Sequence, residues 1–268
     1  MLYGAIIGDM VGAPYEFDRS EKIKDFPLWK KSSRFTDDSV MTLAIADAIL
    51  DAGKDIKEDK FKQYIIHYMR YYGKLYPDMS YGCRFSWWLT MQNPKPLDSY
   101  GNGSAMRVSS IGWLYDTIER TREVARWSAE VSHNHPEGVK GAESVASSIF
   151  LARNNFDKDY IKKYIEDEFG YDLSKTCDEI RPTYHHVESC QETVPQAITA
   201  FLEGKDFEDV IRTAVSLGGD CDTLTCIAGS MAEAMYPIPA DILSECKSRL
   251  TSTLLTVVDK FNKVFKLE

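Results

Sequence analysis

The sequence predicts a compact all-α domain of roughly ten helices. Nearly every periodic segment repeats its apolar residues at helical spacing. Alternating strand patterns are hard to find, and the one Asn-Gly pair, Asn102–Gly103, does not lie between two of them. No internal repeat, low-complexity stretch or long Pro/Gly/Ser linker divides the chain. Residues 1–268 are therefore expected to form a single domain.

The N-terminal segment YGAIIGDMVGAPYEF predicts a helix that packs closely on another. Glycine recurs every fourth residue over positions 4–12, which leaves a smooth strip on one face. Pro14 is placed to break the helix. Asp9 interrupts the apolar surface and, unless it has a function, is expected to be a solvated turn residue. Glu16, at the exit of the helix, is either a surface acid or a mobile carboxylate that can reach a metal, its water or a substrate hydroxyl.

Helices are also predicted in seven further ranges of the chain. Their ranges are 39–53, 60–73, 137–153, 193–204, 206–219, 222–236 and 239–261. Gly53 and Gly73 stand where C-caps would close the first two. The segment after Pro136 is rich in Ala and Ser, which suits a helix packed closely on its neighbours.

Charge and hydropathy argue against several classes of protein. A formal net charge of −9 disfavours a general nucleic-acid or anionic-membrane surface, because both need clustered Lys and Arg. A basic pocket for one phosphate group remains possible. No apolar run reaches the roughly 18 residues of a membrane span, and Asp9 with the lack of a basic leader argues against a signal peptide. Six scattered cysteines without a CxxC pair indicate reduced thiols in a cytoplasmic protein. With no evident interface signature, a monomer is expected.

Two acidic segments stand at the predicted helix starts. GGDCDT places Asp220 and Asp222 behind two glycines, and an earlier TDDS places Asp37 and Asp38 just before the helix that begins near Val40. Each segment alone is explained by helix capping, because Thr, Asp and Ser are favoured N-caps and acids complement the helix dipole. If the two helix starts face each other, however, four aspartates converge. They would then repel and be driven to protonate unless cations neutralise them.

The available ligands in these segments are hard oxygens. They are the carboxylates of Asp37, Asp38, Asp220 and Asp222 and the hydroxyls of Thr36 and Thr223. This set favours Mg²⁺, or Mn²⁺, over zinc. Two ions about 4 Å apart that share an aspartate bridge would satisfy it. His185 and His186 are not counted as ligands, because paired histidines in a polar loop are more often solvated and no acid–histidine spacing supports zinc.

The chain resembles the ADP-ribosylglycohydrolases, which include the dinitrogenase reductase-activating glycohydrolase and the ADP-ribosyl-acceptor hydrolases. The resemblance rests on six blocks in the family's order, from about residue 3 to about residue 237. They are GAIIGDMVGAPYE, FTDDSVMTLAIADAIL, YGNGSAMRVSSIGWLY, SHNHPEGVKGAESVASSIFLAR, VPQAITAFLEG and VSLGGDCDTLTCIAGSMAEAMY.

The resemblance implies a compact all-α fold of orthogonally packed helices, with a dinuclear magnesium or manganese centre. Thr36, Asp37 and Asp38 match the first ligand block of the family. Asp220, Asp222 and Thr223 match the second, with Asp222 as the bridge. Glu16 matches the loop glutamate that closes the site and acts in catalysis, so that Glu16, Asp37 and Asp222 form the expected catalytic set.

Substrate contacts are implied in the same way. The loop Gly101, Asn102, Gly103 and Ser104 would meet the ribose and the diphosphate, with backbone N–H groups approaching phosphate oxygens. His133 falls where members place a histidine near the substrate. Tyr100, Met106 and Trp113 are candidates to stack the adenine, although such residues are more often part of a core. Cys221 stands where many members have Ser or Thr, and its thiol is expected to point away from the metals.

The implied reaction hydrolyses the bond between ribose C1″ of ADP-ribose and an acceptor, either a protein side chain or a small ADP-ribosyl compound. The motif GNGSAMR is closer to the type that cleaves ADP-ribose from serine or from other ADP-ribose compounds, while arginine and nucleic-acid acceptors stay open. One alternative is a hydrolase that attacks the diphosphate and releases AMP. Another is a catalytically idle ADP-ribose-binding relative. A third is that both acidic segments are only helix caps.

Overall fold

The computed structural model describes residues 1–265, and these form helices joined by loops. No extended strand occurs among them, and an isolated antiparallel bridge pairs Gly101 with Ser189. The expected all-α class is confirmed. The elements are α1 (Tyr3–Gly12), a 3-10 helix η1 (Ala13–Tyr15), α2 (Asp37–Ala52), α3 (Glu58–Leu75), α4 (Cys83–Thr90), α5 (Gly103–Met106), α6 (Ser109–Leu114), α7 (Ile118–Glu130), α8 (Pro136–Arg153), α9 (Lys158–Phe169), α10 (Cys177–Ile180), α11 (Cys190–Glu203), α12 (Phe207–Leu217), α13 (Cys221–Met235), α14 (Ala240–Arg249) and α15 (Ser252–Phe265).

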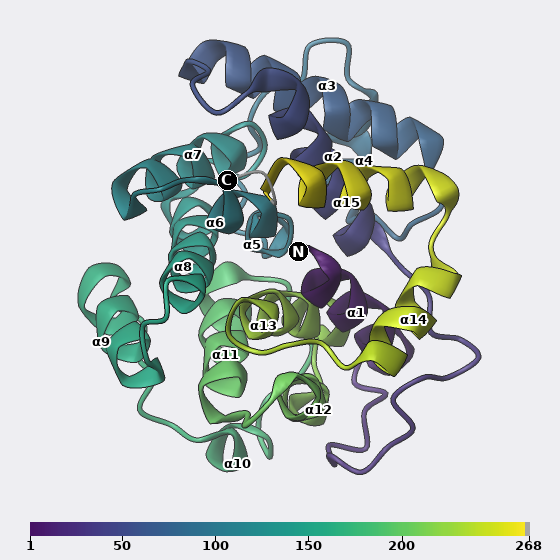
Figure 1. Cartoon of the computed structure of the whole chain (residues 1–268), viewed down its shortest axis with the longest axis vertical. Helices are drawn as coiled ribbons and strands as arrows, with labels where there is room; N and C mark the ends of the chain where they lie inside the picture. The colour runs from purple at the N-terminus through teal and green to yellow at the C-terminus, as the bar shows by residue number, and fades with distance from the viewer. Residues whose placement is uncertain (266–268) are drawn as a thin grey trace.

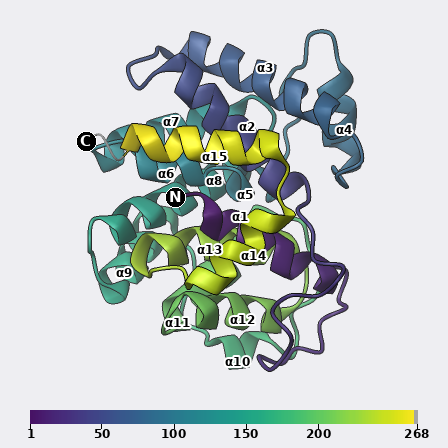
Figure 2. The same ribbon diagram turned by 45° about the vertical axis from the view of Figure 1, so that its right-hand side comes forward.

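Helices α1 and α13 lie side by side at the centre, with α2 and α3 on one side of them and α11 and α12 on the other (Figures 1 and 2). The predicted glycine strip makes this contact. A Cβ atom at Gly4 would lie 2.2 Å from the carbonyl oxygen of Gly229, and one at Gly8 would lie 2.1 Å from that of Thr225. No larger side chain fits there, so the glycines let the two backbones touch.

The surroundings of α1 correct one expectation. Every residue of α1 is buried, Asp9 included, because other helices cover all of its faces. Asp9 is therefore not a solvated turn residue.

Two of the expected helix boundaries also differ from the sequence prediction. Gly53 closes α2 with φ of 78°, as expected, but α3 continues past Gly73 to Leu75. Gly73 instead gives clearance, since a Cβ atom there would lie 2.9 Å from a methyl carbon of Leu89. The expected long C-terminal helix is divided into α14 and α15, and the Thr251 hydroxyl accepts from the Leu254 N–H at the start of the second. The fifteen α-helices in residues 1–265 exceed the roughly ten expected, because short helices such as α5 add to the count. The longer helices α7 and α9 also lie outside the predicted ranges.

Two of the long helices begin at the acidic segments. Thr36 is the N-cap of α2, and Asp220 is the residue before α13. The short helix α5 begins close by, since the Asn102 side chain donates to an Asp220 carboxylate oxygen at 2.6 Å. Residues 16–36 form a long loop that leaves η1 and leads into α2 (Figure 1, purple). None of the helices in the described part of the chain is long and apolar enough to cross a membrane.

Candidate metal centre and active site

The two acidic segments meet in space, as the sequence predicted for facing helix starts. Oxygens of Asp9, Asp38 and Asp222 lie within 4.8 Å of one another, and so do oxygens of Glu16, Asp220 and Asp222. Asp222 belongs to both groups, which is the place that a bridging carboxylate would take. Both groups contain only carboxylates, the hard oxygen donors that suit Mg²⁺ or Mn²⁺.

Helix capping is present here but does not account for the carboxylates. The Thr36 hydroxyl accepts from the Asp38 N–H at 3.3 Å, as an N-cap should. The Asp38 side chain, however, has one buried oxygen, Oδ1, without any hydrogen-bond partner. Its other oxygen, Oδ2, lies 3.3 Å from the hydroxyl oxygens of Thr36 and Thr223. A buried carboxylate oxygen without a donor is costly, and a cation bound there would satisfy it.

Burial and mutual repulsion raise the pKa values of the clustered carboxyl groups. Burial, with the charges of neighbouring aspartates, raises the pKa values of Asp37, Asp38 and Asp222 well above the ordinary aspartate value of 3.8. Burial raises the pKa of Asp220 to about 7, against hydrogen bonds that lower it. The pKa of Glu16 rises to about 7, chiefly through burial and then through the charge of Asp222. The arrangement therefore favours either bound protons or bound cations.

We expect the metal-free protein to lose stability as the pH rises. A carboxyl whose pKa is higher in the folded than in the unfolded chain stabilises the fold while it is protonated. That contribution is present below the unfolded pKa near 4 and is lost as the pH rises through the folded values, which are about 7 for Asp220 and Glu16. Thermal unfolding in EDTA between about pH 4 and pH 8 should show this loss as a falling Tm. Each 1 kcal/mol lost from the free energy of unfolding should lower Tm by about 2–4 °C.

Added Mg²⁺ supplies the control for this pH dependence. Because protons and cations compete for the same oxygens, the rise in Tm caused by Mg²⁺ should grow with pH. A Tm in EDTA that is flat or rising across this range would contradict the repulsion between the carboxylates.

The acidic cluster forms one end of a cavity of about 400 Å³. Eleven of the thirteen site residues predicted from the sequence line this cavity. They are Glu16, Asp37, Asp38, Gly101, Asn102, Gly103, Met106, His133, Asp220, Asp222 and Thr223. Thr36 is buried behind the wall, between Asp9 and Asp38. The Ser104 hydroxyl donates to the Gly138 carbonyl at 2.7 Å and does not reach the cavity.

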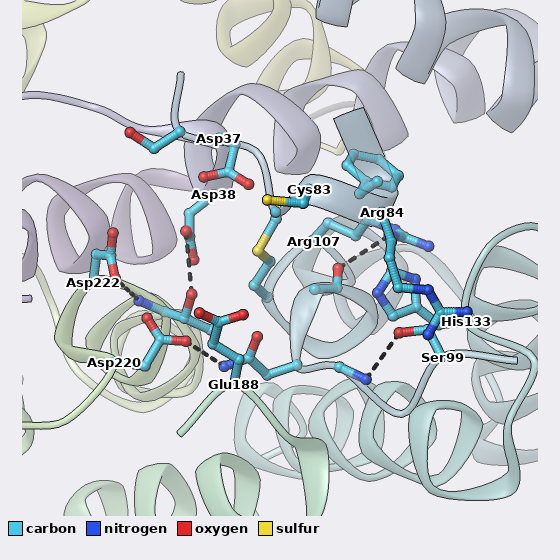
Figure 3. A pocket seen from close by; sticks show the side chains of 18 of the residues that line it. Asp37, Asp38, Cys83, Arg84, Ser99, Arg107, His133, Glu188, Asp220 and Asp222 are labelled. Carbon is cyan, nitrogen blue, oxygen red and sulfur yellow. Dashed lines mark hydrogen bonds between the residues drawn. The ribbon is translucent and has the colours of Figure 1, made fainter. Parts of the chain in front are cut away.

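The opposite end of the cavity carries positive and neutral donors. In Figure 3 the four aspartates lie on one side, and the other side is formed by Arg84, Arg107 and His133. Arg107 is buried and donates to the Gly103 and Ser128 carbonyls and to the Ser132 hydroxyl. Burial lowers its pKa to about 10, so it remains a cation at neutral pH.

A chain of hydrogen bonds holds the His133 ring. The Ser132 hydroxyl oxygen accepts from Arg107 and lies 2.8 Å from Nδ1 of His133, within hydrogen-bond distance. Burial and the charges of Arg107 and Arg84 hold the pKa of His133 well below 6.5, so the ring is neutral. A Cβ atom at Gly103 would lie 3.3 Å from Nε2, a tight contact, so glycine at this position lets the loop lie close against the imidazole.

Glu16 reaches the cavity from the loop after η1. The next two residues, Phe17 and Asp18, have positive φ angles of 56° and 57°, a strained backbone for residues other than glycine. His186 holds this turn. The centre of its ring lies 4.9 Å from that of Phe17, and its backbone N–H donates to the Asp18 carboxylate at 3.1 Å. His186 therefore contacts the Glu16 loop.

The structure also shows cavity residues that the sequence did not single out. Among them are Phe17, Arg84, Phe85, Arg107 and Glu188. Arg107 closes the motif GNGSAMR and could have been found there, whereas the others lie outside any motif. Tyr100 and Trp113 do not line the cavity, so of the three candidates for adenine stacking only Met106 does.

The Cys221 thiol points away from the cluster, as expected. Its sulfur lies 3.8 Å from the Val215 carbonyl oxygen and 4.0 Å from the Thr225 hydroxyl.

Comparisons with known proteins agree on one family. Residues 1–267 match the family profile described as ADP-ribosylglycohydrolase. The chain is 27% identical over 311 residues to ADP-ribosylhydrolase ARH3 of Mus musculus, covering 88% of this chain and 82% of that protein. It is 26% identical over 272 residues to ADP-ribosylarginine hydrolase Tri1 of Pseudomonas putida (strain GB-1), covering 88% of this chain and 70% of that protein.

The same fold occurs in a solved structure. The chain superimposes on an ADP-ribosylglycohydrolase-related protein complex with a TM-score of 0.74 at 20% identity. The match covers 98% of this chain and 95% of that chain. The described helices thus have the arrangement seen in that protein.

Proposed function

The chain belongs to the ADP-ribosylglycohydrolase family, and from this premise we propose that it is a metal-dependent hydrolase. It cleaves the bond between C1″ of ADP-ribose and an acceptor, which is a protein side chain or a small ADP-ribosyl compound. The observation that carries the proposal is the two-ended cavity. One end gathers carboxylates around Asp222, and the other offers Arg84, Arg107 and the glycine loop.

The shape and charge of the cavity suit an ADP-ribosyl group. About 400 Å³ lies within the usual range for small-molecule sites. An ADP-ribosyl group has an anionic diphosphate in its middle and a ribose with neighbouring hydroxyls at its reacting end. The positive charges of Arg84 and Arg107 complement the diphosphate. The N–H groups of Gly101 and Asn102, which were expected to meet phosphate oxygens, donate instead to the Ser99 hydroxyl and the Glu188 carbonyl. The carboxylate end is left for the ribose.

Metal dependence is the second part of the proposal. The oxygens of Thr36, Asp37, Asp38, Asp220, Asp222 and Thr223 would hold two Mg²⁺ ions, or Mn²⁺, and the unpartnered Oδ1 of Asp38 fits this role. When bound, the ions would act as Lewis acids and as a template for the ribose hydroxyls. The acids that remain in excess stabilise the positive charge that develops on the ribose in an oxocarbenium-like transition state.

Glu16 is the group best placed to move a proton. It is half-buried, lines the cavity, and lies on a loop instead of at a helix start. With a pKa raised to about 7, its carboxyl can hold or accept a proton near neutral pH. Deprotonation of the attacking water by Glu16, or proton donation to the acceptor atom, is within the usual capacity of such a group. The Asn102 side chain donates to Asp220 at 2.6 Å and so joins the glycine loop to the acidic end.

Product analysis tests the function directly. Serine-linked and arginine-linked mono-ADP-ribosyl peptides would be incubated with the protein in Mg²⁺ and, separately, in EDTA, and the products identified by mass spectrometry. We expect free ADP-ribose and unmodified peptide from at least one substrate, with loss of the reaction in EDTA. AMP as the product would instead indicate attack on the diphosphate. Binding of ADP-ribose without turnover of either peptide would contradict the hydrolase proposal for these acceptors.

A further inference from the structure

Asp9 is a buried carboxylate in the middle of α1, and it faces the start of α2. Its exposure is 0%, and it does not line the cavity. Two residues of the α2 start donate to it. The Thr36 N–H and hydroxyl lie 2.9 and 2.7 Å from its oxygens, and the Ser39 N–H lies at 3.0 Å with the Ser39 hydroxyl also in contact. Four donors thus meet one side chain, a number that suits an ionised carboxylate.

The bond to Thr36 decides the direction of a hydroxyl proton. The Thr36 hydroxyl oxygen lies 2.7 Å from Oδ1 of Asp9 and 3.3 Å from Oδ2 of Asp38, but it has only one proton to give. The shorter contact to Asp9 takes that proton. The lone pairs of the Thr36 oxygen are then free to face Asp38, whose own N–H uses one of them at 3.3 Å.

The donor count separates Asp9 from the other acids. Its oxygens lie within 4.8 Å of those of Asp38 and Asp222, so by distance alone it could be a metal ligand. Its lone pairs, however, are used by Thr36 and Ser39, whereas Asp38 keeps a buried oxygen without any partner.

We propose that Asp9 is a positioning residue. It holds the hydroxyl proton of Thr36 toward itself and away from Asp38, so that the Thr36 oxygen is available to the metal. Asp9 does not itself bind the metal. This inference rests on the metal dependence proposed above.

An isosteric change reverses the hydrogen bond. In Asp9→Asn the amide oxygen can keep the place of Oδ2, which accepts both backbone N–H groups. The amide nitrogen then takes the place of Oδ1 and donates to the Thr36 hydroxyl, which turns its proton toward Asp38. Thr36→Val removes the hydroxyl and preserves the shape, while Thr36→Ser preserves the hydroxyl.

A double-mutant cycle on metal affinity tests the proposal. Calorimetric titration with Mn²⁺ would compare the wild type, Asp9→Asn, Thr36→Val and the double variant. We expect each single change to weaken binding by about 10- to 100-fold, as loss of an orienting contact usually does. The double variant should bind about as well as Thr36→Val alone, because Asp9 has no further effect once the hydroxyl is absent. Thr36→Ser should bind like the wild type.

Other results separate this inference from the proposed function. If the fold-losses in Mn²⁺ affinity of the two single variants multiply in the double variant, Asp9 acts independently of Thr36, for example as a ligand. That result would overturn the inference but not the proposed function. A wild type that binds neither Mn²⁺ nor Mg²⁺ would overturn the metal dependence and the inference with it. Ser39→Ala is the matched control, because it removes a donor to Asp9 without touching Thr36. It should alter the Tm of the metal-free protein and leave the affinity within about twofold.

Discussion

Replacement of Asp222 by Asn should abolish hydrolysis and weaken Mg²⁺ and Mn²⁺ binding by more than about 100-fold, beyond the loss usual for a residue that only supports a ligand. Asp222 is the carboxylate shared by both acidic groups, so its charge acts on the whole cluster. The metal-free variant should stay folded and be at least as stable as the wild type above neutral pH, because one of several repelling buried charges is removed. Calorimetric titration and thermal unfolding in EDTA would measure the two effects.

A matched control distinguishes a ligand from a helix cap. Asp206 is the N-cap of α12, its side chain accepts from the Asp209 N–H, and it lies outside the cavity. Asn caps helices about as well as Asp, so Asp206→Asn should leave the metal affinity, the activity and the Tm nearly unchanged. If Asp222→Asn behaves in the same way, the acidic segments are caps and the metal proposal fails.

Replacement of Glu16 by Gln should lower kcat by about 10²- to 10⁴-fold, the usual contribution of a general acid–base group. Metal affinity and KM should change little, because the ligands at the starts of α2 and α13 and the glycine loop are left in place. Single-turnover kinetics with the peptide that the protein cleaves would isolate the chemical step, and Mn²⁺ titration would report the metal centre.

The alternative role of Glu16 gives this experiment its second outcome. One Glu16 oxygen lies within 4.8 Å of oxygens of Asp220 and Asp222, a distance that also suits a ligand. A loss of metal affinity as large as the loss of kcat would assign Glu16 to the metal centre instead of to proton transfer. Glu188→Gln is the control, because Glu188 lines the same cavity but is exposed and belongs to neither carboxylate group. Its kcat should stay close to that of the wild type.

Local signals in the sequence predicted most of the helices. Residues 137–153 were predicted as a helix, and α8 spans Pro136–Arg153. Pro136 and the apolar repeat act within one or two turns, so they are readable without the rest of the chain. The prediction of a C-cap at Gly73 was wrong for the same reason. A glycine near the end of an apolar repeat resembles a C-cap, but here it makes room for Leu89 of another helix.

The site was predicted in its chemistry but not in its full membership. The aspartate pairs could be recognised in the sequence, because like charges beside apolar helix segments repel one another unless cations neutralise them. Arg84 and Phe85 were not visible, because they enter the cavity from α4, which has no motif. The sequence left open that Asp9 is a solvated turn residue, because it does not show that other helices enclose α1 on every side.

By itself, the sequence determined the helical class, the glycine strip that brings α1 onto α13, and the hard-oxygen character of the two acidic segments. These depend on residue type and on neighbours three or four positions away. Only the tertiary structure decided that the two carboxylate groups share Asp222 and that Asp9 accepts a hydrogen bond from the Thr36 hydroxyl. It also decided that Arg84 and Arg107 lie at the opposite end of the cavity (Figure 3). Such relations join residues that lie far apart in the chain, Thr223 and Asp38 being 185 positions apart. They arise because packing the backbone of α1 against that of α13 brings the starts of α2 and α13 to one place.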